Sequence, residues 1–174
     1  GYELFKILLE SNKFNLIYKP HPATGSLSDD VLQAHNNIKK LIEENPTQAI
    51  ALEKIDINSV FLAVDIAVFD NSSVMIDFLA QDKPMLLTNR FKPHEEATKI
   101  ATCCKMIDTT NYSDIVSIIE NELSKDTYKT QRATIKRHYL GDYAAGESTQ
   151  KFVDTVADII QQGDEEIKRL EKNR

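Results

Sequence analysis

The 174-residue chain has 41% hydrophobic and 28% charged residues, proportions typical of a globular protein that is long enough to bury a core. Its formal net charge of −6, with acidic residues scattered along the chain, argues against a nucleic-acid partner. The longest apolar run, VFLAVDIAVF, is too short for a membrane-spanning helix and contains Asp65. The sequence therefore predicts one compact domain that does not cross a membrane.

The first half of the chain alternates helical and strand patterns. Apolar residues recur at helical spacing over 4–9, and the β-branched and aromatic run 14–18 predicts a strand that two prolines terminate. Ser28 and two aspartates then open an amphipathic stretch that predicts a helix ending near Asn45. Beyond it, AIALEK is a short apolar segment, INSVFLAV predicts a brief helix, and IAVFD predicts the second clear strand.

The second half continues this alternation. A helix follows IAVFD directly, PMLLT predicts a strand, 89–99 a loop and CCKMID a short strand. A helix that begins between Asn111 and Asp114 precedes a last helix that begins around Ser148. We expect this last helix to bury an apolar stripe formed by Phe152, Val153, Val156, Ile159 and Ile160. We expect residues 163–174 to form a charged helical tail after a single domain over 1–162.

Short apolar strands that alternate with amphipathic helices predict an α/β fold of the Rossmann-like kind, a parallel sheet with helices on both faces. Neither G-x-G-x-x-G nor a P-loop motif occurs. Cys103 and Cys104 are the only cysteines, and we expect them to be buried thiols. No group of His, Cys and carboxylate residues has metal-ligand spacing, so the sequence predicts no metal site.

The segment YKPHP stands just past the first predicted strand, where ligands of open α/β sheets bind. Lys19 and His21 each precede a proline, which holds the backbone extended. A histidine held in this way can donate a proton or hydrogen-bond a phosphate oxygen, and Lys19 can add positive charge. A histidine that only caps a turn is the alternative interpretation. His35 and His138 lie among charged residues on predicted helices, so we expect them to be solvated.

Asn71, Ser72 and Ser73 lie between a predicted strand and the helix that follows it. Hydroxyl groups and unpaired backbone N–H groups at a helix N-terminus favour an anion such as phosphate. Asp70 would repel a phosphate, so we expect it to brace the turn through backbone hydrogen bonds. A helix cap without any ligand explains the same residues equally well.

The loop GDYAAGEST leads into the last predicted helix. Its two glycines allow a ligand to approach the backbone closely, and Ser148 and Thr149 again stand at a helix start. Glu147 can accept hydrogen bonds from a ribose or another polyol. A surface loop with an ordinary cap is the alternative interpretation.

Taken together and in this order, these segments resemble the C-terminal half of the CDP-glycerol glycerophosphotransferase family, the teichoic acid primases and polymerases. YKPHP is similar to the family's K-P-H-P block. DINSVFLAVDIAVFDNSSVMIDFLAQDKPML and GDYAAGESTQKFVDTV are similar to two later blocks of the family. The resemblance spans about Leu4 to Ile160.

The resemblance implies the C-terminal half of a GT-B fold, in which the active site lies in the cleft between two Rossmann-like domains. Such enzymes move glycerol phosphate from CDP-glycerol to a lipid-linked acceptor at the cytoplasmic face of the membrane, with no tightly bound cofactor. By this match His21 acts catalytically on the donor phosphates, Ser72 and Ser73 bind the diphosphate, and Ser148 and Thr149 lie near the same phosphates. From their residue types and positions, we expect Lys19, Asn71 and Glu147 to bind the donor as well. Because the chain opens on Gly1 rather than on methionine, we expect it to be part of a longer protein. The resemblance implies that an N-terminal domain of that protein completes the site, so we expect these 174 residues alone to be inactive.

Two alternatives stay open, one among enzymes and one from a different functional class. Among enzymes, a GT-B glycosyltransferase or epimerase that uses a UDP-sugar also places phosphates at helix N-termini, and a donor with another CDP-linked polyol would fit the same scaffold. The second alternative is a non-catalytic Rossmann-like interaction module that has lost its ligand.

Overall fold

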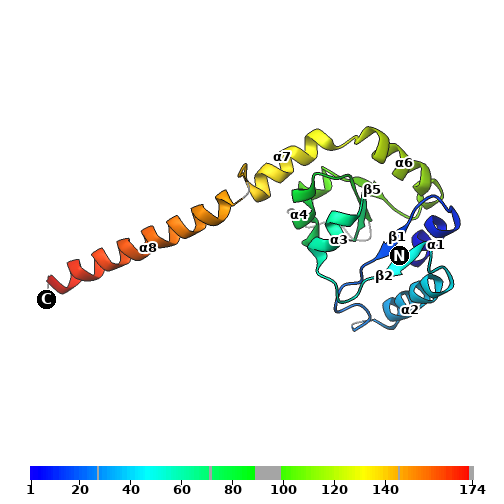
Figure 1. Ribbon diagram of the computed structural model, residues 1–174, viewed down its shortest axis with the longest axis horizontal. Coiled ribbons are helices and arrows are strands. Elements are labelled where there is room, and N and C mark those ends of the chain that lie inside the picture. Colours follow the sequence, from blue (N-terminus) through cyan, green and yellow to red (C-terminus); the bar gives the residue numbers. More distant parts are fainter. Residues whose placement is uncertain (27, 71, 89–98, 145, 173–174) are drawn as a thin grey trace. The chain divides into compact units, whose positions relative to one another are not determined.

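The computed structural model describes residues 1–26, 28–70, 72–88, 99–144 and 146–172 (Figure 1). The chain forms two compact units, Gly1–Lys136 and Arg137–Arg174. The predicted domain over 1–162 extends beyond the first unit, and its C-terminal limit stays a prediction. Within the described ranges, no helix is both long and apolar enough to cross a bilayer.

The first unit alternates strands with helices, as the sequence predicts. Its early elements are α1 (Tyr2–Glu10), β1 (Leu16–Tyr18), α2 (Asp29–Glu44), β2 (Ala49–Ala51), α3 (Ile57–Ala63), β3 (Ala67–Phe69) and α4 (Val74–Phe78). They are followed by the 3₁₀ turn η1 (Leu79–Gln81), β4 (Met85–Thr88), β5 (Lys105–Ile107), the 3₁₀ turn η2 (Tyr112–Asp114) and α6 (Ile115–Lys125). Helix α7 (Lys129–Leu140) begins in the first unit and ends in the second, which also contains α8 (Glu147–Lys172).

All described strand pairs are parallel. β1 pairs with β2, and β3, β4 and β5 form a three-stranded sheet in that order. Leu16 of β1 lies opposite Ala49, and Leu86 of β4 lies opposite Lys105 of β5. Parallel strands need crossover connections: α2 supplies the one from β1 to β2, and α4 with η1 supplies the one from β3 to β4. The predicted α/β fold class is therefore confirmed.

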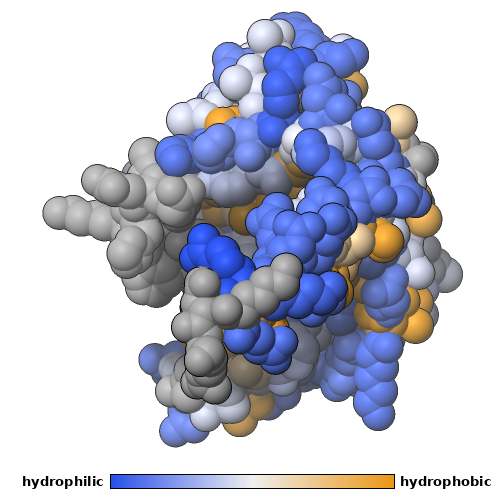
Figure 2. Space-filling model, turned by 90° about the vertical axis from the view of Figure 1, so that its left-hand side faces the viewer, coloured by the Kyte–Doolittle hydropathy of each residue, from blue (hydrophilic) through white to orange (hydrophobic). Residues whose placement is uncertain are grey.

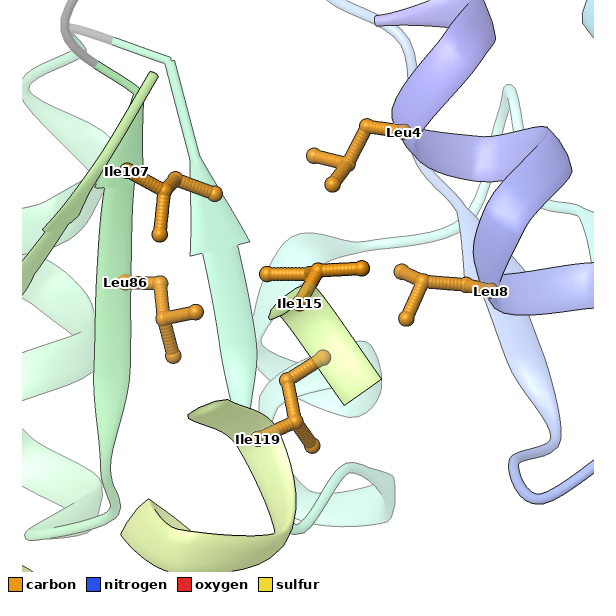
Figure 3. Packing of buried hydrophobic residues seen from close by; sticks show 6 residues of the cluster. All are labelled: Leu4, Leu8, Leu86, Ile107, Ile115 and Ile119. Carbon is orange, nitrogen blue, oxygen red and sulfur yellow. The ribbon is translucent and has the colours of Figure 1, made fainter. Parts of the chain in front are cut away.

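Helices cover both faces of the β3–β4–β5 sheet. On one face, Leu4 and Leu8 of α1 pack with residues of α6 against Leu86 and Ile107 (Figure 3). Side chains alternate along a strand, so Phe69, which lies opposite Leu87, points to the other face. There it meets the ring of Phe78 of α4 edge-on, at a centroid distance of 5.3 Å. This two-sided packing explains why the short strand β4 is almost continuously apolar.

A second cluster of buried residues lies between the β1–β2 pair and the helices α1 and α2. It consists of Leu9, Ile38, Ile42 and Ala49. Leu16 of β1 contacts both this cluster and the one on the larger sheet, so the two sheets share one continuous core. Ile66, the residue before β3, also packs against the larger cluster. The amino ends of β1 and β3 therefore both lie against the core cluster on the larger sheet.

Within the first unit, the beginning of helix α7 is anchored by Arg132, whose side chain is completely buried. Its guanidinium donates two hydrogen bonds to the Asp126 carboxylate, at 2.8 and 2.6 Å, and one to Asp82 Oδ1 at 3.1 Å. Burial acts to lower the pKa of Arg132, but the hydrogen bonds and charges of Asp126 and Asp82 outweigh it and raise that pKa. Asp126 ends α6 and Asp82 follows η1, so the arginine joins three segments.

The prediction that the last helix buries its apolar stripe is wrong. In α8, drawn in orange to red in Figure 1, Phe152 is 69% exposed and Val153, Val156, Ile159 and Ile160 are exposed as well. A helix buries its apolar stripe only against another layer, and the second unit contains no sheet among its described residues. Figure 2 shows a face on which hydrophilic residues predominate and hydrophobic residues are exposed in patches.

Candidate functional site

The turn after β1 holds His21 through hydrogen bonds made within the turn. The backbone N–H of Thr24 donates to the His21 carbonyl at 2.8 Å, and the N–H of Ala23 donates to His21 Nδ1 at 3.1 Å. Because a backbone N–H can only donate, Nδ1 must accept, and the proton of the neutral ring lies on Nε2. His21 is exposed. The turn therefore presents an imidazole of defined tautomer to the solvent.

Gly25 closes the same turn with a left-handed backbone, at φ +84°. A Cβ atom at this position would lie 2.8 Å from Leu32 Cδ1 and 3.1 Å from Leu32 Cα. Leu32 belongs to α2, so the turn packs closely against that helix. The sequence signal for this feature is the glycine in HPATG, which a residue with a side chain cannot replace without strain.

We expect Gly25→Ala to lower the free energy of unfolding by about 1–2 kcal/mol, because a left-handed backbone costs alanine roughly this much and Leu32 must also move. Urea denaturation of both proteins measures the difference. Leu32→Ala removes the closest atom, so the Gly25→Ala loss should be smaller in that background. Unchanged stability of Gly25→Ala would contradict the close packing of the turn.

Lys19 connects the turn after β1 to the segment after β2. Its ammonium donates to the backbone carbonyl of Glu53 at 2.8 Å, and the Glu53 carboxylate pairs with Lys39 of α2 at 2.8 Å. The hydrogen bond to Lys39 lowers the pKa of Glu53, and the same bond raises the pKa of Lys39. An ammonium has three N–H donors, so Lys19 keeps donors for a phosphate while it braces the turn.

His35, which the sequence suggests is solvated, is instead half-buried and lies within 3.0 Å of the Tyr18 hydroxyl through its Nδ1. Burial, and then the charge of Glu53, raises the pKa of Tyr18. Tyr18 is the last residue of β1, so this contact fixes the end of the strand that leads into the histidine turn. The charged residues next to His35 in sequence suggest an exposed side chain, because its contact with Tyr18 forms only when α2 packs against β1.

Ser72 and Ser73 lie between β3 and α4. The N–H of Val74 donates to the Ser72 hydroxyl oxygen, and the N–H of Met75 donates to the Ser72 carbonyl. The N–H of Ile76 donates to the Ser73 carbonyl. The first amides of α4 are thus already used, and the serine hydroxyls are what this turn offers an anion. Ser73 makes no side-chain capping bond. Asn71 lies outside the described residues, as do residues 89–98 of the loop predicted over 89–99.

Thr88, which the sequence does not single out, supports this turn from the neighbouring strand. It ends β4, and its hydroxyl donates to Asp70 Oδ1 at 2.7 Å. Asp70 directly follows β3, so the bond joins the carboxyl ends of two paired strands. The signal that could have revealed Thr88 is its position, a polar residue at the end of the apolar strand PMLLT.

Glu147, Ser148 and Thr149 are the first three residues of α8 and belong to the second unit. All three are exposed. Glu147 Oε2 accepts a hydrogen bond from the N–H of Ala144 at 2.8 Å, which closes the loop that leads into the helix. That these three residues bind the same donor as His21 and Ser72 stays a prediction.

Two of the three predicted segments, the His21 turn and the Ser72 turn, each follow the carboxyl end of a parallel strand. β1 and β3 begin at one core, and the His21 turn and the Ser72 turn follow at the opposite, carboxyl ends of these strands. The predicted burial of Cys103 and Cys104 is confirmed, and both are free thiols. Among the described residues, no group of three or more His, Cys, Asp or Glu side chains is arranged to hold a metal ion.

A parallel α/β unit with polar turns beyond its strands belongs to the Rossmann-like class, whose ligands bind at that edge of the sheet. A family model described as CDP-glycerol:poly(glycerophosphate) glycerophosphotransferase matches residues 3–158. The chain belongs to this family of transferases, whose donor substrate is CDP-glycerol. No curated protein and no solved structure was found to match the chain. The resemblance seen from Leu4 to Ile160 is thus confirmed over nearly the same residues.

Proposed function

We propose that this chain is the donor-binding domain of a transferase that moves glycerol phosphate from CDP-glycerol to a lipid-linked acceptor of the teichoic-acid type. Membership of the family supports the reaction and the donor. The observation that carries the role of the site is the hydrogen bond from Ala23 N–H to His21 Nδ1, because it leaves an Nε2–H donor at the end of β1. An N-terminal domain of the same protein would complete the cleft, in a GT-B arrangement at the inner face of the membrane.

In the proposed reaction, an acceptor hydroxyl oxygen attacks the phosphorus that carries glycerol, and the bond from that phosphorus to the oxygen shared with CMP breaks. Negative charge develops on the departing CMP phosphate. His21 Nε2–H would donate a hydrogen bond or a proton to this oxygen, which stabilises the leaving group. The proton of the acceptor hydroxyl passes to a base that the completed cleft supplies.

The remaining phosphate contacts are assigned to groups that carry positive charge or a hydroxyl. Lys19 would supply charge next to His21, and Ser72 and Ser73 would donate hydroxyl hydrogen bonds to the diphosphate. Ser148 and Thr149 would contact the same phosphates, while Glu147 and Asn71 would contact the glycerol or ribose hydroxyls. No tightly bound cofactor takes part in this proposal.

We expect CDP-glycerol and CMP to raise the thermal midpoint of the chain, because a ligand that binds only the folded state stabilises it. A ligand at about ten times its Kd contributes roughly 1.4 kcal/mol, which shifts the midpoint of a chain of this size by about 3–5 °C. CDP-ribitol and UDP-glucose complete the panel. Ser72→Ala should reduce the shift by CDP-glycerol, and Ser113→Ala, at an exposed serine of η2, is the matched control.

A larger shift with UDP-glucose than with CDP-glycerol would favour a sugar transferase or epimerase. No shift with any nucleotide, together with full activity of the complete enzyme after substitution of Ser72 and His21, would favour an interaction module without catalysis.

A further inference from the structure

A hollow of about 350 Å³ lies between β5, α6 and the connection from α6 to α7. Lys105, the first residue of β5, lines it, so the hollow is at the amino end of the parallel sheet. The His21 and Ser72 turns follow strands at their carboxyl ends. This hollow is therefore at the opposite edge of the sheet from the proposed donor site, and its size is within the range of small-molecule sites.

The hollow has a buried carboxylate in its wall. Glu122 of α6 is only 4% exposed. Its Oε2 accepts a hydrogen bond from the N–H of Thr127 at 3.1 Å, and its Oε1 has only a long contact of 3.4 Å with the Asn121 amide. Among the described residues no cationic group pairs with Glu122. A buried charge without a counter-charge is costly, so a cation that enters the hollow would stabilise this carboxylate. Its oxygens can accept further hydrogen bonds from such a cation.

A positive charge lines the same hollow without neutralising Glu122. Lys105 is half-buried, and within the described part of the chain its ammonium makes neither a hydrogen bond nor an ion pair. Tyr128, also half-buried, has a hydroxyl with no hydrogen-bond partner among those residues. Opposite charges thus face one hollow but do not pair with each other.

We propose that this hollow binds a small zwitterion, with the ligand's ammonium group toward Glu122 and its carboxylate or phosphate toward Lys105. A ligand with a charge of each sign compensates both side chains at once, whereas an ion with a single charge compensates only one. Asn121, Ser117 and the Tyr128 hydroxyl supply further hydrogen bonds along the wall. This site is independent of the donor nucleotide.

The test is calorimetric titration of the 174-residue chain with β-alanine and O-phosphoethanolamine, compared with propionate and ethylamine, which each carry one of the charges. We expect at least one zwitterion to bind at least tenfold more tightly than either singly charged compound. The preferred zwitterion distinguishes a carboxylate from a phosphate ligand. Equal binding of all four compounds, or no binding of either zwitterion, would overturn the proposal.

Two substitutions test the charges separately. Glu122→Gln keeps an acceptor for Thr127 N–H but removes the negative charge, and Lys105→Met removes the positive charge; each should weaken binding of the zwitterion at least tenfold. Glu10→Gln and Lys6→Met, at an exposed ion pair on α1, are the matched controls and should leave binding unchanged. Wild-type affinity in both hollow variants would also overturn the proposal.

A charge reversal keeps the test decisive if Glu122→Gln fails to fold. Lys105→Glu makes both charges negative, so it should abolish binding of the zwitterion and create binding of 1,3-diaminopropane. Circular dichroism of each variant establishes that it is folded. Retained zwitterion binding by folded Lys105→Glu contradicts the proposed orientation of the ligand. Because no nucleotide is present, these results do not depend on the proposed transfer activity.

Discussion

Replacing His21 by alanine in the complete enzyme is expected to lower kcat/KM for glycerol phosphate transfer by about 10²–10⁴-fold, the usual contribution of a positioned acid or base. The loss arises because alanine has no Nε2–H to stabilise the departing CMP. The histidine is exposed and its ring contacts its own turn, so the variant should retain the stability of the parent protein. Initial rates with CDP-glycerol, together with a thermal midpoint, measure both quantities.

A second substitution separates the two roles open to His21. The amide nitrogen of glutamine can occupy the place of Nε2 and donate a hydrogen bond, but it cannot transfer a proton. Near-normal activity of His21→Gln would assign hydrogen bonding, whereas a loss as large as that of alanine would assign proton transfer. His138→Ala, at an exposed histidine of α7, is the matched control. Unchanged transfer by His21→Ala would contradict any catalytic role.

Replacing Asp126 by asparagine is expected to lower the free energy of unfolding by about 3–5 kcal/mol, as for other broken buried ion pairs. Arg132 is fully buried, and Asp126 supplies two of its charge-assisted hydrogen bonds. Asparagine tolerates the left-handed backbone at this position, where φ is 45°, so the substitution tests the charge. Asp82→Asn should cost less, because Asp82 is 46% exposed and contributes one side-chain bond.

Urea denaturation of single and double variants tests this expectation. In an Arg132→Met background the buried cation is gone, so Asp126→Asn should then cost less than about 1 kcal/mol. Asp142→Asn is the matched control, because it breaks the exposed pair with Arg137 and should change stability by less than about 0.5 kcal/mol. A loss below about 1 kcal/mol for Asp126→Asn in the parent protein would mean that the Arg132 cluster contributes little.

The family and most of the elements of the first unit could be predicted because both depend on local patterns. The exception is β2 (Ala49–Ala51), whose segment AIALEK was expected only to be apolar. Short apolar strands between amphipathic helices predict parallel pairing, since consecutive parallel strands need a helical crossover. The two prolines around His21 likewise predict a constrained turn just past β1, and the structure places it there. The buried thiols of Cys103 and Cys104 follow from the same kind of reasoning about residue type.

The wrong prediction for α8 shows where local patterns stop being informative. An apolar stripe at helical spacing states which side of a helix is apolar, but it does not state whether another layer covers that side. Phe152 and Ile160 satisfy the pattern and are still exposed. The contact between Tyr18 and His35 is the converse case, because neither residue type nor spacing reveals it.

The sequence by itself determined the parallel α/β class, the family and the turn that carries His21, because each depends on residues close together along the chain. Only the tertiary structure decided that Nδ1 of His21 accepts Ala23 N–H, that Lys19 reaches Glu53, and that Arg132 joins Asp82 to Asp126. Arg132 and Asp82 are fifty residues apart, and only the folded chain brings them together, with the Arg132 side chain completely buried and the Asp82 carboxylate partly exposed. The partners of Lys19 and the burial of Arg132 depend on segments that are distant in sequence, so no single segment could have revealed them.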